Sequence, residues 1–339
     1  MIFWSFITVI FITLLIAYLL GPKPPIPKYD LILPALPDDL KELEDFIEKR
    51  EKETPFIRPD NNARIIWHKG SEYKKTPYSL VYLHGFSASY IEADPIHKEF
   101  AQRFGCNLYL PRLYAHGVMP PEPMLDFSAE KMVHSALEAF AIASKIGDKV
   151  IIMAASTGAT VGLYLAAHFT QIKGLICFSP NIDLYSRFSF ILRLRWGLYL
   201  ARLIFWSKYR EFEVEPQGKP YWTHKYRIEA LIALKNLLAT TMNNKVFQKI
   251  TQPVFLGYYY ENEDRQDKTV SVKKMLYMFK HLGTNPDKKW KRSFPSAGVH
   301  SISSRFTSKS WRHLQDESFQ FAEKVLELKP VEQSSEVRE

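Results

Sequence analysis

The chain has 339 residues, of which 46% are hydrophobic and 24% charged, enough apolar sequence for one large domain or two modest ones. Its formal net charge is +9, but no run of five or six basic residues and no nucleic-acid-binding motif accompanies that charge, so nucleic-acid binding is not expected. The two cysteines, Cys106 and Cys177, lie in apolar stretches without metal-ligand or C-x-x-C spacing, and we expect both to be buried free thiols.

The first 20 residues are apolar and carry no charged side chain. A helix of about 20 residues spans about 30 Å, the thickness of the hydrocarbon core of a bilayer. The segment lacks the basic start and the small-x-small cleavage site of a secretory signal peptide, so residues 1–20 are predicted to be an uncleaved single-pass membrane anchor. Lys23 and Lys28 follow it, which favours a cytoplasmic body, although two lysines leave the side of the membrane open.

Residues 21–62 are predicted to be a linker followed by a surface helix. The stretch GPKPPIP, residues 21–27, ends the anchor helix and begins an extended segment because proline cannot continue a helix. Residues 38–52 then have the charged amphipathic pattern of a short helix on the surface of a domain.

From residue 63 onward, apolar strand-like runs alternate with helical segments. An edge strand is expected at 63–69, further strands at 79–83, 107–110, 149–153, 173–178, 253–260 and 289–294, and helices between them at 96–104, 129–146 and 270–282. Such alternation is typical of an α/β fold with a mostly parallel sheet and helices on both faces.

Residues 184–250 are too long for a simple crossover between two strands, and they are predicted to be an inserted helical cap or lid. Within this cap, residues 188–206 are expected to form an amphipathic or nearly all-apolar helix interrupted by Gly197, and residues 226–242 a second helix. The core domain would then consist of residues 63–183 and 251–330, followed by a polar tail at 331–339.

Ser156 is the candidate nucleophile. It follows a buried strand and precedes a helix, in the pentapeptide Ala154-Ala155-Ser156-Thr157-Gly158, which matches the small-x-Ser-x-small pattern of a nucleophile elbow. Its backbone must be strained for the hydroxyl to project above the sheet, and small residues must flank it; Ala154 stands where glycine is usual. The plainer interpretation is that Ser156 only caps the helix.

A serine hydroxyl needs a base, and the base needs an orienting acid. Where the chain order is Ser, acid, His, the histidine that follows the last strand in a glycine-containing loop is His300. Four acids follow the preceding strand, and Asp267 is preferred over Asp264 because the chain re-enters the domain just after it. The N–H groups of Phe86, after the His84-Gly85 turn, and of Thr157 are the candidate oxyanion donors.

These motifs occur in a definite order along the chain. His84-Gly85-Phe86 comes first, then Leu110-Pro111-Arg112-Leu113 with His116-Gly117, the turn at Ser156, Asp267-x-x-Val270 and Gly298-x-His300. The set resembles the α/β-hydrolase superfamily over roughly residues 63–328, and is most similar to the monoacylglycerol lipase-like esterases, also labelled serine aminopeptidase-like hydrolases. The resemblance implies a Ser156–Asp267–His300 triad with an oxyanion hole from the amides of Phe86 and Thr157.

The predicted function is therefore that of a membrane-anchored serine hydrolase acting on carboxylic esters, with acylglycerols or other lipids as substrates. The chemistry requires no metal or organic cofactor, and no protein partner is inferred. Two alternatives use the same fold. One is an acyltransferase or aminopeptidase working with the same triad, and the other is a catalytically silent binding protein tethered to a membrane.

Overall fold

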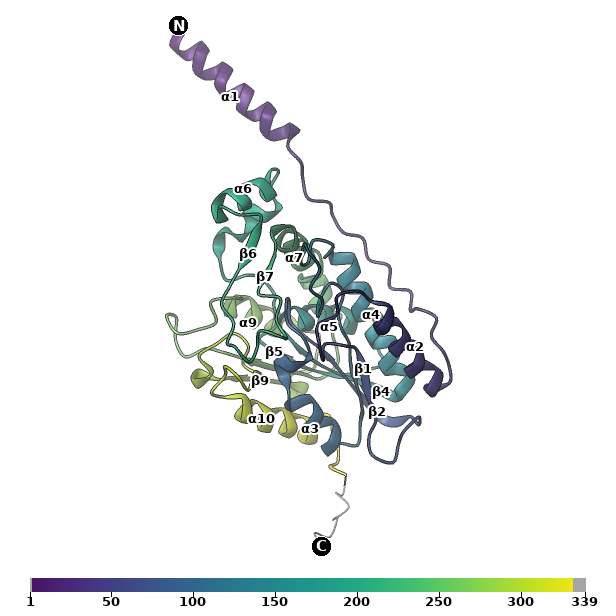
Figure 1. Ribbon diagram of the computed structural model, residues 1–339. Coiled ribbons are helices and arrows are strands. Elements are labelled where there is room, and N and C mark those ends of the chain that lie inside the picture. Colours follow the sequence, from purple (N-terminus) through teal and green to yellow (C-terminus); the bar gives the residue numbers. More distant parts are fainter. Residues whose placement is uncertain (1, 332–339) are drawn as a thin grey trace.

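A single mixed sheet organises the molecule in a computed structural model that describes residues 2–331 (Figure 1). Its seven strands lie in the order β1-β3-β2-β4-β5-β8-β9, and all neighbours are parallel except β1, which runs antiparallel to β3. The strands are β1 (Arg64–Ile66), β2 (Thr76–Leu83), β3 (Asn107–Leu110), β4 (Gly147–Ala155), β5 (Ile172–Phe178), β8 (Val254–Tyr258) and β9 (Lys289–Ser293). The expected α/β fold with a mostly parallel sheet is confirmed, with strand ends shifted by up to three residues.

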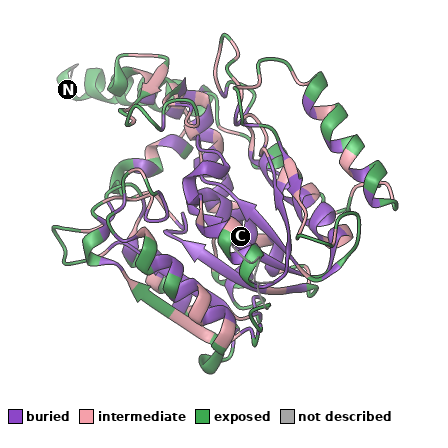
Figure 2. Ribbon diagram, turned by 60° about the horizontal axis from the view of Figure 1, so that its bottom comes forward, coloured by how far each residue is buried: buried purple, intermediate pink, exposed green. Residues whose placement is uncertain are grey.

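Helices cover both faces of the sheet, because alternate side chains of each central strand point to opposite sides. In β2, Val81 and Leu83 join one buried cluster, whereas Leu80 and Tyr82 join the other. The first cluster includes side chains of α2 (Leu40–Glu53), α4 (Ala129–Ile146), α5 (Ser156–Ala166), α7 (Ile228–Thr241) and α9 (Val272–His281). The second includes α3 (Ile96–Arg103) and α10 (Trp311–Lys324), and the central strands between the two layers are mostly buried (Figure 2).

The surface helix expected at 38–52 is α2, which begins at Leu40 after the N-cap Asp39. The Asp39 side chain accepts hydrogen bonds from the N–H groups of Lys41 and Glu42, two of the donors that the first turn leaves unpaired. Leu43 and Ile47 are buried in the core, so only the outer face of this helix is on the surface.

The segment between β5 and β8 contains short elements and the long helix α7. The short elements are η2 (Arg187–Arg193), α6 (Gly197–Phe205), the antiparallel pair β6 (Tyr209–Glu211) and β7 (Lys225–Arg227), and α8 (Asn244–Phe247). The remaining 3-10 helices are η1 (Tyr90–Ala93), η3 (Pro286–Lys288) and η4 (Pro295–Ala297). Helix α7 packs against α4 and α5 as part of the core, whereas η2 and α6 form a separate small cluster with α7.

The segment 188–206, expected to be a helix interrupted by Gly197, consists of two separate helical segments, η2 and α6, with the break immediately before Gly197. Trp196 has a φ of +64°, in the left-handed region, which a continuous right-handed helix cannot contain. At Gly197 a Cβ would lie 2.5 Å from the carbonyl oxygen of Ile191, so the two helical segments approach too closely for any side chain there.

Helix α1 (Ile2–Leu20) projects from the body of the molecule (Figure 1). Its window Phe3–Leu20 has a mean hydropathy of 2.4 and is not buried against the rest of the chain, so α1 is long and apolar enough to cross a membrane. A single-pass anchor and a secretory signal share these features. Of the polar tail predicted at 331–339, only Val331 lies within the described residues.

Candidate active site

Ser156 occupies a sharp turn between β4 and α5. Its φ is +48°, a left-handed conformation that costs a non-glycine residue free energy and persists where the surrounding structure enforces it. Ala154, two residues before the serine, is fully buried and pairs with Leu83 on one side and Cys177 on the other. The serine is 7% exposed.

Gly158 is the most crowded position of this turn. A Cβ there would lie 2.0 Å from the carbonyl oxygen of Leu83 and 2.5 Å from that of His84. Glycine therefore allows the first turn of α5 to pass directly beside the end of β2, which brings the residues after β2 close to Ser156.

We expect Gly158→Ala to destabilise the fold by about 3 kcal/mol, since backbone atoms would have to move to accommodate the methyl group. Gly162→Ala in the same helix is the matched control, because the Cβ would lie 3.1 Å from the Ile152 side chain, which can shift slightly. Thermal unfolding followed by circular dichroism measures both. Equal melting temperatures for the two variants would contradict this view of the turn.

His300 lies between Ser156 and Asp267. Its Nε2 is 2.9 Å from the Ser156 Oγ, and its Nδ1 is 2.6 Å from the Asp267 Oδ2. The other carboxylate oxygen of Asp267 accepts the N–H groups of Thr269 at 2.8 Å and Val270 at 3.0 Å, which fixes the orientation of the carboxylate. The structure thus brings together the three side chains that the sequence selected.

The alternative acid, Asp264, lies in the exposed part of the loop after β8. Its backbone N–H donates to the side chain of Asn262 within a local turn. Asp267 is buried and faces the imidazole, so the geometry favours Asp267 for the position next to His300.

The environment raises the pKa of His300 above its usual value. Burial by itself lowers this pKa, but the charge and hydrogen bond of Asp267, together with the charge of Glu92, outweigh burial. The imidazole is consequently a stronger base than a free histidine while its side chain remains 18% exposed at the surface.

The candidate oxyanion donors belong to the two segments that meet beside Ser156. A Cβ on Gly85 would lie 3.2 Å from the Ser156 Cβ, so the turn that carries Phe86 is in contact with the serine. Thr157 is buried in the first turn of α5, where amide groups have no partner within the helix and the helix dipole is positive. The segments that carry the Phe86 and Thr157 amides therefore both lie beside Ser156.

Glu92 is a buried acid beside this site that the sequence analysis did not select. Its Oε2 accepts the N–H of Gly85 at 2.7 Å and the hydroxyl of Tyr82 at 3.2 Å. The Ser303 hydroxyl, from the loop after His300, donates to the Glu92 backbone oxygen at 2.9 Å. Burial raises the pKa of the Glu92 carboxyl, and its hydrogen bond with Gly85 opposes that shift. The residue thus connects the turn at Gly85 to the loop that carries His300.

His84 and His116 form part of the wall next to Phe86 and are not placed to act as bases. Burial lowers the pKa of His84 to about 3 and that of His116 to about 4, so both rings are neutral at physiological pH. The His84 Nδ1 lies 3.0 Å from the Gly85 oxygen and its Nε2 accepts the N–H of Leu113 at 3.2 Å. These bonds join the turn after β2 to the loop after β3.

The cap reaches the same turn from above. The Thr223 N–H donates to the Ser87 oxygen at 2.7 Å, and the ring of Tyr226 packs edge-on against Phe86 with centroids 5.2 Å apart. Phe127 packs against Phe86 in the same way at 5.1 Å. The Phe86 ring is therefore in contact with aromatic rings from both the core and the cap.

Two large cavities lie outside the three-residue centre. One, of about 710 Å³, lies between α2, α4 and the loop after β3, and the other, of about 650 Å³, lies beside the cap. Ser156, Asp267 and His300 line neither of them. No group of three or more His, Cys, Asp or Glu side chains in the described part of the chain is arranged to hold a metal ion.

Comparison with known proteins gives one family and a set of similar folds. The model of the alpha/beta hydrolase family matches residues 80–303, more than half of the chain. No curated protein sequence matches the chain.

Three similar structures share 12–15% sequence identity with the chain. A structure reported with LipS and LipT, two metagenome-derived lipolytic enzymes, has a TM-score of 0.61 at 15% identity and covers 79% of this chain and 99% of its own. A monoacylglycerol lipase from Paleococcus ferrophilus has a TM-score of 0.56 at 12% identity and covers 76% and 96%. A monoglyceride lipase from Saccharomyces cerevisiae, in complex with a substrate analogue, has a TM-score of 0.55 at 15% identity and covers 77% and 91%.

Proposed function

The chain belongs to the alpha/beta hydrolase family, and from this we propose that it is a membrane-anchored serine hydrolase that cleaves carboxylic esters. The observation that carries this proposal is the pair of hydrogen bonds that His300 makes, at 2.9 Å with the Ser156 hydroxyl and at 2.6 Å with Asp267. A hydroxyl, an imidazole and a carboxylate in this order are the groups that acyl transfer requires.

The reaction proceeds in two steps through an ester formed on Ser156. In the first step His300 takes the proton of the Ser156 hydroxyl as the oxygen attacks the substrate carbonyl, and the N–H groups of Phe86 and Thr157 stabilise the oxyanion. His300 then gives the proton to the leaving alcohol. In the second step water attacks the acyl-enzyme in the same way, which releases the carboxylic acid and restores the serine.

Two features support a lipid-like ester as the substrate. The buried rings of Phe127 and Tyr226 pack against Phe86, so the residues around the turn after β2 are apolar, as a site for an acyl chain or an aromatic group requires. Helix α1 would hold the enzyme at a membrane, where such esters concentrate. Monoacylglycerol lipases among the similar structures have this class of substrate.

A series of p-nitrophenyl esters from acetate to palmitate tests the function and the substrate class together. We expect hydrolysis of the series, with kcat/KM highest for chains longer than acetate. Products formed mainly by transfer to an added alcohol would instead indicate an acyltransferase, and faster cleavage of an amide series an aminopeptidase. Folded protein without any turnover would indicate the silent binding protein.

We propose that Glu92 is a positioning residue, since it holds the turn that carries Phe86 through the Gly85 N–H. Glu92→Ala leaves this N–H without its acceptor, and we expect kcat to fall about 10- to 100-fold, less than the 10²- to 10³-fold typical for complete loss of one oxyanion donor. Glu92→Gln keeps an acceptor and should restore most of kcat.

The pH dependence of kcat/KM separates this role from a purely structural one. The charge of Glu92 contributes to the raised pKa of His300, so removing the charge should move the acidic limb of the profile of Glu92→Gln toward lower pH. A kcat for Glu92→Ala equal to that of the wild type would contradict the positioning role.

A further inference from the structure

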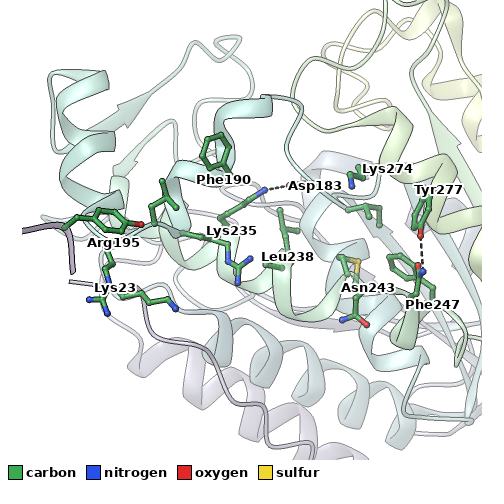
Figure 3. A pocket seen from close by; sticks show the side chains of 17 residues that line it. Lys23, Asp183, Phe190, Arg195, Lys235, Leu238, Asn243, Phe247, Lys274 and Tyr277 are labelled. Atoms are coloured by element: carbon green, nitrogen blue, oxygen red, sulfur yellow. Dashed lines mark hydrogen bonds and ion pairs between the residues drawn. The ribbon is translucent and has the colours of Figure 1, made fainter. Parts of the chain in front are cut away.

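The cavity of about 650 Å³ lies where the end of α1 meets the cap. Its lining comes from α1 and the linker after it, from η2 and the break before α6, and from α7, α8 and α9. Figure 3 shows Lys23 and Arg195 at the end where the anchor enters, and Lys274 and Tyr277 at the opposite end. None of the residues proposed for catalysis lines it, so the cavity is separate from the ester-cleaving centre.

Positive charge dominates this cavity. Five cationic side chains line it, namely Lys23, Arg193, Arg195, Lys235 and Lys274, against a single carboxylate, Asp183. Lys235 is nearly buried and is paired with Asp183, as the dashed line in Figure 3 marks, and its ammonium also donates to the Ser189 hydroxyl at 2.9 Å. The charges of Lys235 and Asp183 balance each other, and the other four cationic side chains give the cavity its net positive charge.

The remaining four, Lys23, Arg193, Arg195 and Lys274, form no ion pair with a carboxylate within the described residues. Like charges that face one cavity repel each other, and an anion bound between them removes that cost. Guanidinium groups suit a phosphate in particular, because their N–H donors match two of its oxygens. The cavity therefore has the chemistry of a phosphate site.

The position of the cavity relative to α1 identifies the source of the phosphate. The Trp196 indole N–H donates to the Ala17 oxygen at 3.0 Å, its backbone N–H donates to the Pro22 oxygen at 2.9 Å, and the Arg195 guanidinium donates to the Gly21 oxygen at 2.7 Å. These bonds hold the end of the anchor against the loop that lines the cavity. A helix that spans a bilayer ends at the level of the lipid headgroups, so the cavity lies at the depth of the lipid phosphates.

The surface next to the cavity carries side chains that are typical of the lipid headgroup region. Tyr18 lines the cavity, and the rings of Trp196 and Tyr199 pack together with centroids 5.6 Å apart. Aromatic side chains of this kind concentrate at membrane interfaces. Helix α6 exposes Leu203 and Ile204 and is followed by Trp206, which is 87% exposed, so apolar side chains continue along this face. An amphipathic helix with such a face lies in the plane of the interface.

We propose that this cavity binds the phosphate headgroup of an anionic phospholipid from the membrane in which α1 is embedded. The lipid phosphate lies among Lys23, Arg193 and Arg195, and its acyl chains run beside the exposed apolar side chains of α6. Binding there requires that α1 spans a membrane, as proposed above, but it does not require ester hydrolysis. The bound lipid fixes the cap relative to the membrane surface.

The test titrates the full chain with dioleoyl-phosphatidylglycerol or dioleoyl-phosphatidylcholine in mixed micelles and measures binding by native mass spectrometry. Every protein carries Ser156→Ala, so that hydrolysis of the lipid cannot affect the result. The variant is Lys23→Gln with Arg193→Gln, two exposed residues of the cavity. The matched control is Lys28→Gln with Arg187→Gln, the same residue types on the same two segments but outside the cavity lining.

We expect one phosphatidylglycerol per chain to bind more tightly than phosphatidylcholine. Each basic side chain near an anionic lipid contributes about 1 kcal/mol, so the Lys23/Arg193 variant should bind about 30-fold more weakly while the control is unchanged. Equal binding of the two lipids, or an equal loss in the control, would overturn the proposal. Binding of inorganic phosphate alone as tight as that of phosphatidylglycerol would overturn it too, because the cavity would then be a site for a soluble anion.

Discussion

Ser156→Ala should lower kcat for ester hydrolysis by about 10⁴- to 10⁶-fold, the range typical when the nucleophile of a catalytic triad is removed. The alanine has no oxygen to form the acyl-enzyme, and the backbone donors nearby act only on a carbonyl that is already under attack. Labelling by a fluorophosphonate probe, which reacts with activated serines, should disappear in parallel. KM should change little, because the methyl group leaves the surrounding rings in place.

Ser186→Ala is the control for this experiment, since Ser186 is exposed on the cap and has no role in the proposed reaction. Labelling and hydrolysis should both remain at the wild-type level. Probe labelling that persists in Ser156→Ala would show that another serine is the nucleophile. Absence of labelling in the folded wild type would favour the silent binding protein instead.

The turn at Ser156 was predictable because its signal is local. An apolar run, a cluster of small residues and a resumed helical pattern occupy 17 consecutive residues, 151–167, and the backbone follows them directly. His300 was predictable for a different reason, since chain order and the end of the last strand together leave it as the preferred histidine. The signals for Ser156 and His300 both come from the sequence close to the residue and from the general topology of a parallel sheet.

Other features depend on contacts between distant segments, and the sequence alone left them open or missed them. Asp264 and Asp267 lie in the same acidic loop. Only Asp267 is buried against His300, because the chain turns back into the domain directly after it. Glu92 lies in a short 3-10 helix that carries no sequence motif. Its role is visible only from its hydrogen bonds with Gly85 and Ser303, which belong to other loops. The interruption at Gly197 was predictable, but the left-handed backbone of Trp196 and the close approach of η2 to Gly197 depend on packing.

Asp267→Asn should lower kcat/KM by about 10⁴-fold, because an amide beside the imidazole Nδ1 favours the wrong tautomer and no longer stabilises the charged ring. The pH profile should change as well. The base must be neutral, so activity of the wild type rises with pH through the pKa of His300. That pKa is raised despite the lowering effect of burial, because Asp267 contributes the largest opposing effects. Removing the charge lowers the pKa, and the residual activity of Asp267→Asn should therefore begin to rise at a lower pH.

Asp264→Asn provides the matched control, since Asp264 is exposed in the same loop and does not contact the imidazole. Its kcat/KM and pH profile should equal those of the wild type, measured with the ester that gives the highest turnover. A large loss in Asp264→Asn with little effect in Asp267→Asn would reverse the assignment of the acid. A loss of activity in both variants without a shift of the acidic limb would mean that the loop only stabilises the fold. A structural defect lowers the amount of active enzyme, but it does not change the pKa of His300 in the molecules that remain folded.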